Sequence, residues 1–508
     1  MTGNHALYPS VVHMLEAAAR QQPYRTALVC GEDKLTYGAY FACVSALATE
    51  LRTEGIGAGD RVVTIMGNSA DAAIATFGVQ AAGAQLVPLN PAYTMAELAP
   101  VIADADPRAI LFDQSLSGRL VGNLPASVLS IGIGAGGRRL IAPPEMPIQQ
   151  LDPLVPQPGS LSTLQYTGGT TGLPKGANLT HRAVATNVAQ REALLPTNEG
   201  EQVLCITPLF HVYAVSMGLY LAANCRGTLH IVRKFDAGSV LSLIAGEKIT
   251  VLSASPTILL GLMAHQDFAG TNFETLKVCS SGSAALPESA LERWEAATGC
   301  PVCEGYGQTE AGPVLSYNPR YGMRKPGTVG VAVPQTEIEI VDHVEGSAVL
   351  PSGETGEIRA RGPQIMSGYR NRPKETGEAL RNGWLYTGDI GRIDADGYLT
   401  ICDRKKDMVI TAGFNVYPRE IEDVLMTHGG ILEAAVIGVP DAYRGEVLVA
   451  CVVRRNPELS DQMLMEHLGE RLTKYKWPKE IRFFETLPKT TVGKTNKSAL
   501  REMSAQCG

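Results

Sequence analysis

A glycine-rich loop that ends in a lysine is the stretch of this sequence with the most evident chemistry. Residues 166–176 have the sequence YTGGTTGLPKG. Glycine lets the backbone approach an anion closely, threonine hydroxyls can donate hydrogen bonds, and lysine adds a positive charge. The composition therefore predicts a binding site for phosphate groups.

The loop does not have the spacing of a P-loop, which is G-x-x-x-x-G-K-[ST]. Counting back from Lys175, the second glycine would fall at Pro174, which has no backbone N–H to donate. Gly176 stands where a P-loop has its serine or threonine. This mismatch argues against a P-loop kinase or ATPase, which would release ADP or phosphate.

Composition describes a large globular chain. Its 508 residues predict two or more domains, and 45% hydrophobic with 19% charged residues is ordinary for a soluble protein. A net charge of −7 gives no general attraction to nucleic acid or anionic membranes. The ten cysteines are scattered, the start lacks a secretory signal, and no apolar stretch resembles a membrane span. We expect a cytoplasmic protein, and a monomer and a homodimer both stay open.

Short apolar runs alternate with longer helical runs from Val62 to about Ile340. This alternation predicts an α/β fold, with βα-layered subdomains in one large N-terminal domain. The expected strands are at 61–67, 85–90, 108–113, 202–209, 228–235 and 250–256, and the expected helices are at 69–83, 94–106, 215–225 and 239–248.

The pattern changes to short strands with glycine-rich turns at about 335–402, which predicts a small antiparallel sheet or barrel. After DRKKD at 403–407 a compact α+β domain is expected. We therefore predict domains at 1–403 and 404–508. The second domain should contain helices at 418–428 and 461–475 and strands at 432–440, 448–455 and 480–488.

Six further motifs follow the loop along the chain: TPLFHVYAV (207–215), SSGSAALP (280–287), EGYGQTEAGP (304–313), WLYTGDIG (384–391), CDRKKDMVITAGFNVYPREIE (402–422) and PKTTVGKTNK (488–497). Together they resemble the adenylate-forming superfamily of acyl-CoA synthetases, 4-coumarate-type ligases and luciferases. The resemblance implies that a carboxylate attacks the α-phosphate of Mg·ATP, and that a thiol then displaces AMP from the acyl-adenylate. It also implies a mobile C-terminal lid.

The resemblance implies roles for residues of the predicted N-terminal domain. Lys175 and the loop would bind the β- and γ-phosphates, although the family often has serine at the position of Gly168. Glu310 and Thr170 would contact magnesium, with Thr309 at the α-phosphate. The loop set is Thr167, Gly168, Gly169, Thr170, Thr171 and Gly172, and the adenine set is Gly282, Ser283, Ala284, Glu304, Gly305 and Tyr306.

The same resemblance assigns roles nearer the C-terminus. Asp389 and Arg404 would bind the ribose, Lys406 would be the hinge, and Lys494 would bridge the carboxylate and the α-phosphate. On the residues alone, Lys406 belongs to a solvated charge run. Gly413 would line the pantetheine tunnel. Because no carrier domain follows residue 508, we expect free CoA as the thiol acceptor, with ATP and Mg²⁺ as the other cofactors.

The family's acyl pocket maps onto a mostly apolar set, which suits an aliphatic or aryl tail. The stretches EGYGQTEAGPVLSYNP (304–319) and YTGGTTG (166–172) resemble those of bacterial fatty-acyl ligases, and this resemblance implies a medium- or long-chain fatty acid as substrate. A 4-coumarate-like aryl acid or another acid, including a malonate-type one, is the alternative. A non-catalytic nucleotide-binding protein is less favoured, because it would not need Lys494, Glu310 and the loop together. The pocket set is His211, Tyr213, Ala214, Met217, Gly305, Gly307, Pro313, Val314 and Leu315.

Overall fold

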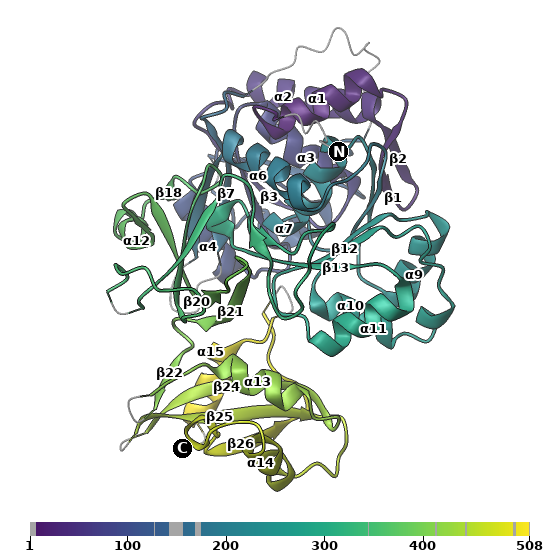
Figure 1. The fold of residues 1–508 in the computed structure, drawn as a ribbon. Helices are drawn as coiled ribbons and strands as arrows, with labels where there is room; N and C mark the ends of the chain where they lie inside the picture. Colours follow the sequence, from purple (N-terminus) through teal and green to yellow (C-terminus); the bar gives the residue numbers. More distant parts are fainter. Residues whose placement is uncertain are drawn as a thin grey trace. The chain divides into compact units, whose positions relative to one another are not determined.

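A computed structural model describes residues 7–125, 127–141, 156–167, 174–343, 345–411, 414–441, 444–490 and 494–506. The chain divides into two compact units, whose elements Figure 1 labels. The first unit comprises Met1–Leu286, Ala290–Glu337 and Ala360–Leu385. The second comprises Pro287–Ser289, Ile338–Arg359 and Tyr386–Gly508.

A nine-stranded sheet of order β15-β14-β13-β12-β11-β9-β10-β1-β2 lies in the first unit. Neighbouring strands from β13 to β1 run parallel, whereas the pairs β13–β14, β14–β15 and β1–β2 are antiparallel. The bounds are β1 (Thr26–Cys30), β2 (Asp33–Thr36), β9 (Gln202–Cys205), β10 (Thr228–Ile231), β11 (Val251–Ala254), β12 (Val278–Ser281), β13 (Val302–Gly307), β14 (Val314–Tyr317) and β15 (Val331–Ala332).

A seven-stranded sheet of order β18-β8-β7-β4-β3-β5-β6 completes the first unit. The strands from β7 to β6 are parallel, and β8 pairs antiparallel with both β7 and β18. Every residue of β4 is buried, as expected for a strand covered on both faces. The bounds are β3 (Arg61–Ile65), β4 (Gln85–Leu89), β5 (Ala109–Asp113), β6 (Leu129–Ile133), β7 (Leu161–Thr167), β8 (Lys175–Thr180) and β18 (Gly368–Tyr369).

Helices connect these strands. Helices α9, α10 and α11 lie together in Figure 1 and share one apolar cluster, which includes the buried Trp294, with the inner strands β9, β11, β12 and β13. The helices up to residue 379 are α1 (Val11–Gln21), α2 (Tyr37–Thr53), α3 (Ala70–Ala81), α4 (Met95–Ala105), η1 (Gln114–Leu116), α5 (Ser117–Leu120), α6 (His181–Leu194), α7 (Val212–Ala214), η3 (Val215–Tyr220), α8 (Leu221–Asn224), α9 (Ala237–Gly246), α10 (Pro256–Ala264), η4 (Phe268–Gly270), α11 (Glu288–Thr298), η5 (Thr309–Ala311) and α12 (Pro373–Ala379).

Two five-stranded sheets account for the remaining strands. One has the order β16-β17-β20-β19 with β21 on β20, and the other has the order β23-β22-β25-β24 with β26 on β25. The bounds are β16 (Glu337–Val341), β17 (Gly356–Arg361), β19 (Leu380–Arg381), β20 (Trp384–Ile393), β21 (Leu399–Arg404), β22 (Val409–Thr411), β23 (Phe414–Val416), β24 (Ile431–Asp441), β25 (Gly445–Arg454) and β26 (Glu480–Phe484).

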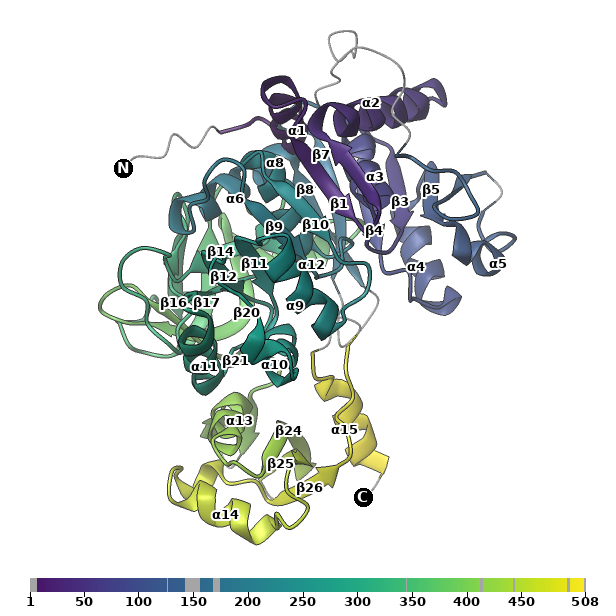
Figure 2. The same cartoon turned by 90° about the vertical axis from the view of Figure 1, so that its right-hand side faces the viewer.

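Helices cover both faces of the last sheet in the second unit (Figure 2). The side chains of α13 (Pro418–Met426) and α14 (Asp461–Gly469) share one apolar cluster with β25. Leu500 of α15 (Lys497–Gln506) belongs to a second cluster, which contains Ala435 and Ile437 of β24. The alternation of inward and outward side chains on the strands thus provides two separate cores. A short 3₁₀ helix, η6 (Lys474–Lys476), precedes β26.

The α/β class predicted from the alternating runs is confirmed, with two differences in detail. The helix expected at 215–225 begins with a π-helical turn, η3, and continues as α8. The helix expected at 461–475 ends at Gly469, where a Cβ would crowd the ring of Trp477. The boundary at DRKKD stays a prediction. Among the described residues, none of the helices combines the length and hydropathy that a transmembrane helix needs.

The cysteines of the described part of the chain form no disulfide. Nine are free thiols, and all of these except Cys402 are buried. Burial raises the pKa of Cys205, Cys225 and Cys300 to about 12. The cysteines therefore pack as small apolar side chains.

Candidate active site

The predicted phosphate loop connects the two strands of an antiparallel hairpin. Thr167 at the end of β7 pairs with Lys175 at the start of β8, and its Oγ1 donates to the Lys175 carbonyl at 3.3 Å. A strand follows the loop, whereas a helix follows a P-loop, so the exclusion made from Pro174 is supported by the fold. Gly168, Gly169, Thr170, Thr171 and Gly172 lie outside the described residues.

Gly176 has a packing reason to be glycine. A Cβ at this position would lie 2.7 Å from Leu164 Cδ1 and 3.1 Å from Tyr166 Cζ. A serine or threonine, which a P-loop would require here, would displace both β7 side chains. The residue after Lys175 is therefore set by the hairpin's packing.

Lys175 and Glu310 both contact one tyrosine, Tyr369. The Tyr369 hydroxyl donates to Glu310 Oε1 at 2.6 Å, and Lys175 Nζ lies 4.6 Å from the centroid of the Tyr369 ring. The structure thus joins the lysine predicted to bind phosphate with the carboxylate predicted to bind magnesium. Tyr369 was not among the residues predicted from the sequence.

Glu310 and Thr309 lie on the short 3₁₀ turn η5. Glu310 is buried, with 8% of its surface exposed. The amide of Met366 donates to the Glu310 carbonyl at 2.8 Å, which ties the turn to the segment before β18. Gly312 ends the turn with φ +72°, a conformation that favours glycine. The backbone of Glu310 is therefore fixed by the Met366 amide, and its carboxylate is bound by the Tyr369 hydroxyl.

The predicted adenine residues come from two neighbouring strands. Gly282, Ser283 and Ala284 follow β12, and Glu304, Gly305 and Tyr306 belong to β13. Ser283 has φ +73°, which turns the chain sharply after the strand. Glu304 Oε2 accepts from the Leu286 amide at 3.1 Å and so fastens this turn to β13. The structure brings the six residues together.

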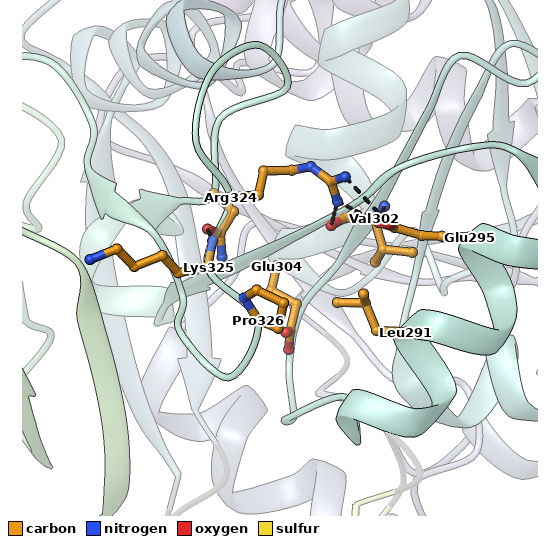
Figure 3. A pocket seen from close by; sticks show the side chains of 8 residues that line it. Leu291, Glu295, Val302, Glu304, Arg324, Lys325 and Pro326 are labelled. Atoms are coloured by element: carbon orange, nitrogen blue, oxygen red, sulfur yellow. Dashed lines mark hydrogen bonds and ion pairs between the residues drawn. The ribbon is translucent and has the colours of Figure 1, made fainter.

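A small pocket of about 70 Å³ lies beside Glu304 (Figure 3). Arg324 spans one side of it, where it forms an ion pair with Glu295 and donates to the Val302 carbonyl at 3.2 Å. Of the residues predicted to bind nucleotide, Glu304 is one that lines this pocket. The other lining residues are Leu291, Glu295, Val302, Asn318, Arg324, Lys325 and Pro326.

The predicted acyl residues come from α7 and its flanks, from η3 and from the β13–β14 hairpin. Gly307 pairs with Val314, and a Cβ at Gly307 would collide with the Pro313 carbonyl. Ala214, Met217 and Leu315 are buried. His211 caps α7, and its Nδ1 accepts from the Tyr213 amide at 3.3 Å.

Two tyrosine rings face two of the predicted glycines. The ring of Tyr213 lies 3.1 Å from the position that a Cβ on Gly282 would take. The ring of Tyr317 covers Gly305, where any Cβ would collide with it. The Tyr213 hydroxyl also lies 3.3 Å from Ser280 Oγ. Tyr317 was not predicted from the sequence, and it occupies space next to the expected acyl site.

The predicted ribose and hinge residues lie on β20 and β21 of the second unit. Asp389 pairs with Arg404 across these strands, and their side chains form an ion pair at 3.9 Å. The charge run after β21 is not uniform. Lys405 Nζ binds the buried carboxylate of Glu357 at 2.8 Å, whereas Lys406 is exposed in the turn that follows. Gly413 lies outside the described residues.

Lys494 lies shortly before α15, within the electrostatic range of Asp389 and Arg404. Its amide donates to Thr490 Oγ1 at 3.1 Å, and its carbonyl accepts from the Thr490 amide at 2.7 Å. The pKa of the Lys494 ammonium is lowered to about 8, mainly by burial and also by Arg404, while Asp389 opposes the shift. The structure therefore brings together three of the residues predicted near the C-terminus.

Two tyrosines that contact predicted site residues, Tyr369 and Tyr317, were missed. Tyr369 lies far along the chain from both residues that it contacts, so no local pattern marks it. The glycine before it, Gly368, is a weak signal in the sequence. In the structure Gly368 has φ +134° and begins a strand of two residues. Tyr317 ends β14, where a strand that begins with Val314 and Leu315 makes it resemble a core residue.

Two family models match this chain. Residues 15–370 match the AMP-binding enzyme family, and residues 420–494 match the AMP-binding enzyme C-terminal domain. The chain is 36% identical to a long-chain-fatty-acid–CoA ligase of Bacillus subtilis, over 96% of this chain and 93% of the relative. It is 34% identical to a feruloyl-CoA synthase of Amycolatopsis, over 95% of this chain and 96% of the relative.

A solved structure has the same fold over nearly the whole chain. ATP-bound MatB from Rhodopseudomonas palustris superposes with a TM-score of 0.90 at 31% identity, covering 98% of this chain and 99% of that one. The family match covers more than half of the sequence and includes the hairpin, Tyr369 and Glu310. This chain belongs to the family of AMP-binding enzymes.

Proposed function

We propose that this protein is an AMP-forming acyl-CoA synthetase that activates a fatty acid with ATP and transfers the acyl group to CoA. The observation that carries the proposal is the meeting of Lys175, Tyr369 and Glu310 at the phosphate hairpin. A cation for phosphate and a carboxylate for a metal ion are the two groups that nucleotide activation requires. Similarity to a long-chain-fatty-acid–CoA ligase along almost the entire chain supports the same conclusion.

The reaction has two steps. In the first, a carboxylate oxygen of the acid bonds to the α-phosphorus of ATP, and the bond to the oxygen that bridges the β-phosphate breaks, so pyrophosphate leaves. In the second, the CoA sulfur bonds to the acyl carbon, the bond to AMP breaks, and the thiol proton passes to solvent. Both steps move negative charge, so positively charged groups are the main catalytic devices that the chain can supply.

We assign the charged residues to these steps. Lys175 binds the leaving phosphates, and Lys494 stabilises the charge that develops between the acid and the α-phosphate. Asp389 accepts hydrogen bonds from the ribose hydroxyls, with Arg404 beside it. Because Asp389 would hold the adenosine half in both steps, it should matter to both.

Magnesium fits the residues at this site. Mg²⁺ in nucleotide sites is commonly held by one or two carboxylates together with phosphate oxygens, and Glu310 supplies one carboxylate. Among the described residues, no group of three or more His, Cys, Asp or Glu side chains could hold a metal without a nucleotide. Glu310 would therefore hold Mg²⁺ together with the triphosphate, and the ion would neutralise phosphate charge.

We infer that residues 404–508 act as a lid that turns about Lys406 between the two steps. Two observations support the hinge. Lys406 lies in the turn between β21 and β22, close to the predicted domain boundary. A separate family match at 420–494 indicates that this part of the chain is a module of its own.

The acid is proposed to be a fatty acid because the expected acyl residues are buried and mostly apolar. An aryl acid is the second candidate, because Tyr213 and Tyr317 place two rings against Gly282 and Gly305. Aromatic side chains can stack with a flat aryl group. The similarity to a feruloyl-CoA synthase favours the same alternative.

Product analysis tests the proposal. Acid, ATP, Mg²⁺ and CoA should yield AMP, pyrophosphate and acyl-CoA in equal amounts, and ADP as the nucleotide product would refute it. A panel of acids then separates the two candidates. The variant Tyr317→Ala should favour longer alkyl chains by removing the ring over Gly305. If Tyr317→Ala loses only aryl acids, the second candidate is correct.

A further inference from the structure

Tyr369 is the described residue that touches both Lys175 and Glu310. Its hydroxyl donates to one carboxylate oxygen of Glu310 at 2.6 Å, and its ring faces the Lys175 ammonium at 4.6 Å. Among the described residues, no ion pair joins Lys175 to Glu310. Tyr369 therefore contacts both the Lys175 ammonium and the Glu310 carboxylate, which do not form an ion pair with each other.

The fold fixes Tyr369 beside the hairpin through its backbone. Strand β18 pairs antiparallel with β8, with Tyr369 opposite Ala177. The Tyr369 amide donates to Thr376 Oγ1 of α12 at 2.9 Å. On either side, the amide of Arg370 donates to the Gly176 carbonyl at 2.8 Å, and Gly368 has no room for a Cβ next to Thr376. These contacts fix the position of the Tyr369 backbone beside the hairpin.

A direct ion pair between Lys175 and Glu310 would work against the proposed reaction. Each group would have to leave the other before it could contact phosphate or metal. A ring face holds an ammonium without a formal negative charge, and a phenol hydroxyl occupies one carboxylate oxygen while leaving the other available. Tyr369 can thus orient both groups and keep both charges available for a ligand.

We propose that Tyr369 is the positioning residue that directs Lys175 and Glu310 toward the metal-bound triphosphate. The inference rests on the proposed function, because it uses the phosphate role of Lys175 and the metal role of Glu310. Tyr369 acts through these two residues. Its hydroxyl orients Glu310 for the metal ion, and its ring positions Lys175 for the phosphates.

The two halves of the tyrosine can be separated by measuring the Kd of ATP with and without Mg²⁺, in the absence of acid so that no turnover occurs. Tyr369→Phe keeps the ring and should reduce the Mg²⁺-dependent tightening of ATP binding by about 10-fold, as for other residues that orient a metal ligand. Without Mg²⁺, its Kd should stay within about twofold of the wild type. Tyr369→Leu should in addition weaken metal-free ATP binding by about 5-fold, through loss of the cation–π contact.

Tyr166→Phe is the matched control. Tyr166 also donates its hydroxyl to a carboxylate, Asp104, at 2.7 Å, and it lies on the neighbouring strand β7. Its hydroxyl is bonded to neither Lys175 nor Glu310, so both Kd values should equal those of the wild type. An equal loss in Tyr166→Phe and Tyr369→Phe would show that any buried hydroxyl in this region matters, and would overturn the proposal.

The double variant Glu310→Gln/Tyr369→Phe tests the route of the effect. If the hydroxyl acts through Glu310, the double variant should bind Mg·ATP no more weakly than Glu310→Gln alone. Additive losses, or a Tyr369→Phe variant that binds like the wild type, would overturn the inference. A wild-type protein without any Mg²⁺-dependent tightening would instead contradict the proposed function, so the two failures are distinguishable.

Discussion

Lys175 and Lys494, the two lysines predicted to handle phosphate, are held in contrasting environments. Lys175 begins a strand and faces the ring of Tyr369, which is an attractive partner for a cation. Lys494 lies shortly before α15, where burial and Arg404 both lower its pKa and Asp389 opposes the shift. Lys175 has a favourable contact without any ligand, whereas the environment of Lys494 disfavours the charged form of its side chain.

This difference suggests what each site is built to do. A cation with a built-in partner can stay in place while nucleotides come and go. A cation in an unfavourable environment gains most when an anion approaches, so its stabilising effect is concentrated where negative charge develops. We therefore expect Lys175 to contribute to binding and Lys494 to contribute to one chemical step.

Replacing Lys494 should have the largest effect. Lys494→Ala should slow adenylate formation by about 10²–10³-fold, which corresponds to about 3–4 kcal/mol of transition-state stabilisation. The second step, started from synthetic acyl-adenylate and CoA, should be almost unchanged. Rapid-quench measurement of each half-reaction provides the comparison.

The hinge offers the opposite variant to Lys494→Ala. Lys406→Pro fixes φ in the proposed hinge, so it should preserve adenylation and suppress thioester formation. Equal damage to both half-reactions in both variants would contradict the assignment of the two lysines to separate functions.

Lys175→Ala should have the next largest effect, and on a different parameter. Loss of a charged contact with phosphate is expected to cost about 1.5–3 kcal/mol, so the Kd of ATP should rise by about 10–100-fold. Lys494→Ala should leave this Kd nearly unchanged. Calorimetry measures the Kd of ATP for both variants. If Lys494→Ala weakened ATP binding as much as Lys175→Ala does, the assignment of binding to Lys175 and of one chemical step to Lys494 would be wrong.

The pH dependence of adenylation should show the smallest effect. The charged form of Lys494 is the active one, and its pKa is lowered to about 8, so activity should be full below that pH and fall above it. In kcat/KM for pyrophosphate release, the fall should approach tenfold per pH unit. In Lys494→Arg the side chain stays charged, so this falling limb should disappear. A limb that persists in Lys494→Arg would assign the titration to another group.

Most of the fold could be predicted because its signals are local. Apolar runs such as 85–90 and 108–113 gave the strands β4 and β5, and both are parallel to β3 as the alternation indicated. The π-helical turn at Val215–Tyr220 could not be predicted, because a run of apolar residues fits several helical forms. Helix ends depended on contacts such as that between Gly469 and Trp477.

The site was predictable where motifs carry it and not where contacts between distant segments complete it. The sequence indicated Lys175 and Glu310, but the distance between them along the chain hid the residue that they share. Tyr369 becomes visible only when β18 pairs with β8. Tyr317 was hidden for a similar reason, since only the β13–β14 hairpin places its ring on Gly305.

The buried thiols have a consequence for chemical selectivity. An acyl-adenylate is a strong acylating agent, and any thiolate of the protein that reached it would compete with CoA. Only the thiolate is an effective nucleophile, and burial raises the pKa of Cys205, Cys225 and Cys300 to about 12, so these sulfurs stay protonated at neutral pH. By burying them, the fold protects the enzyme from acylating these cysteines while it prepares an intermediate meant for a different sulfur.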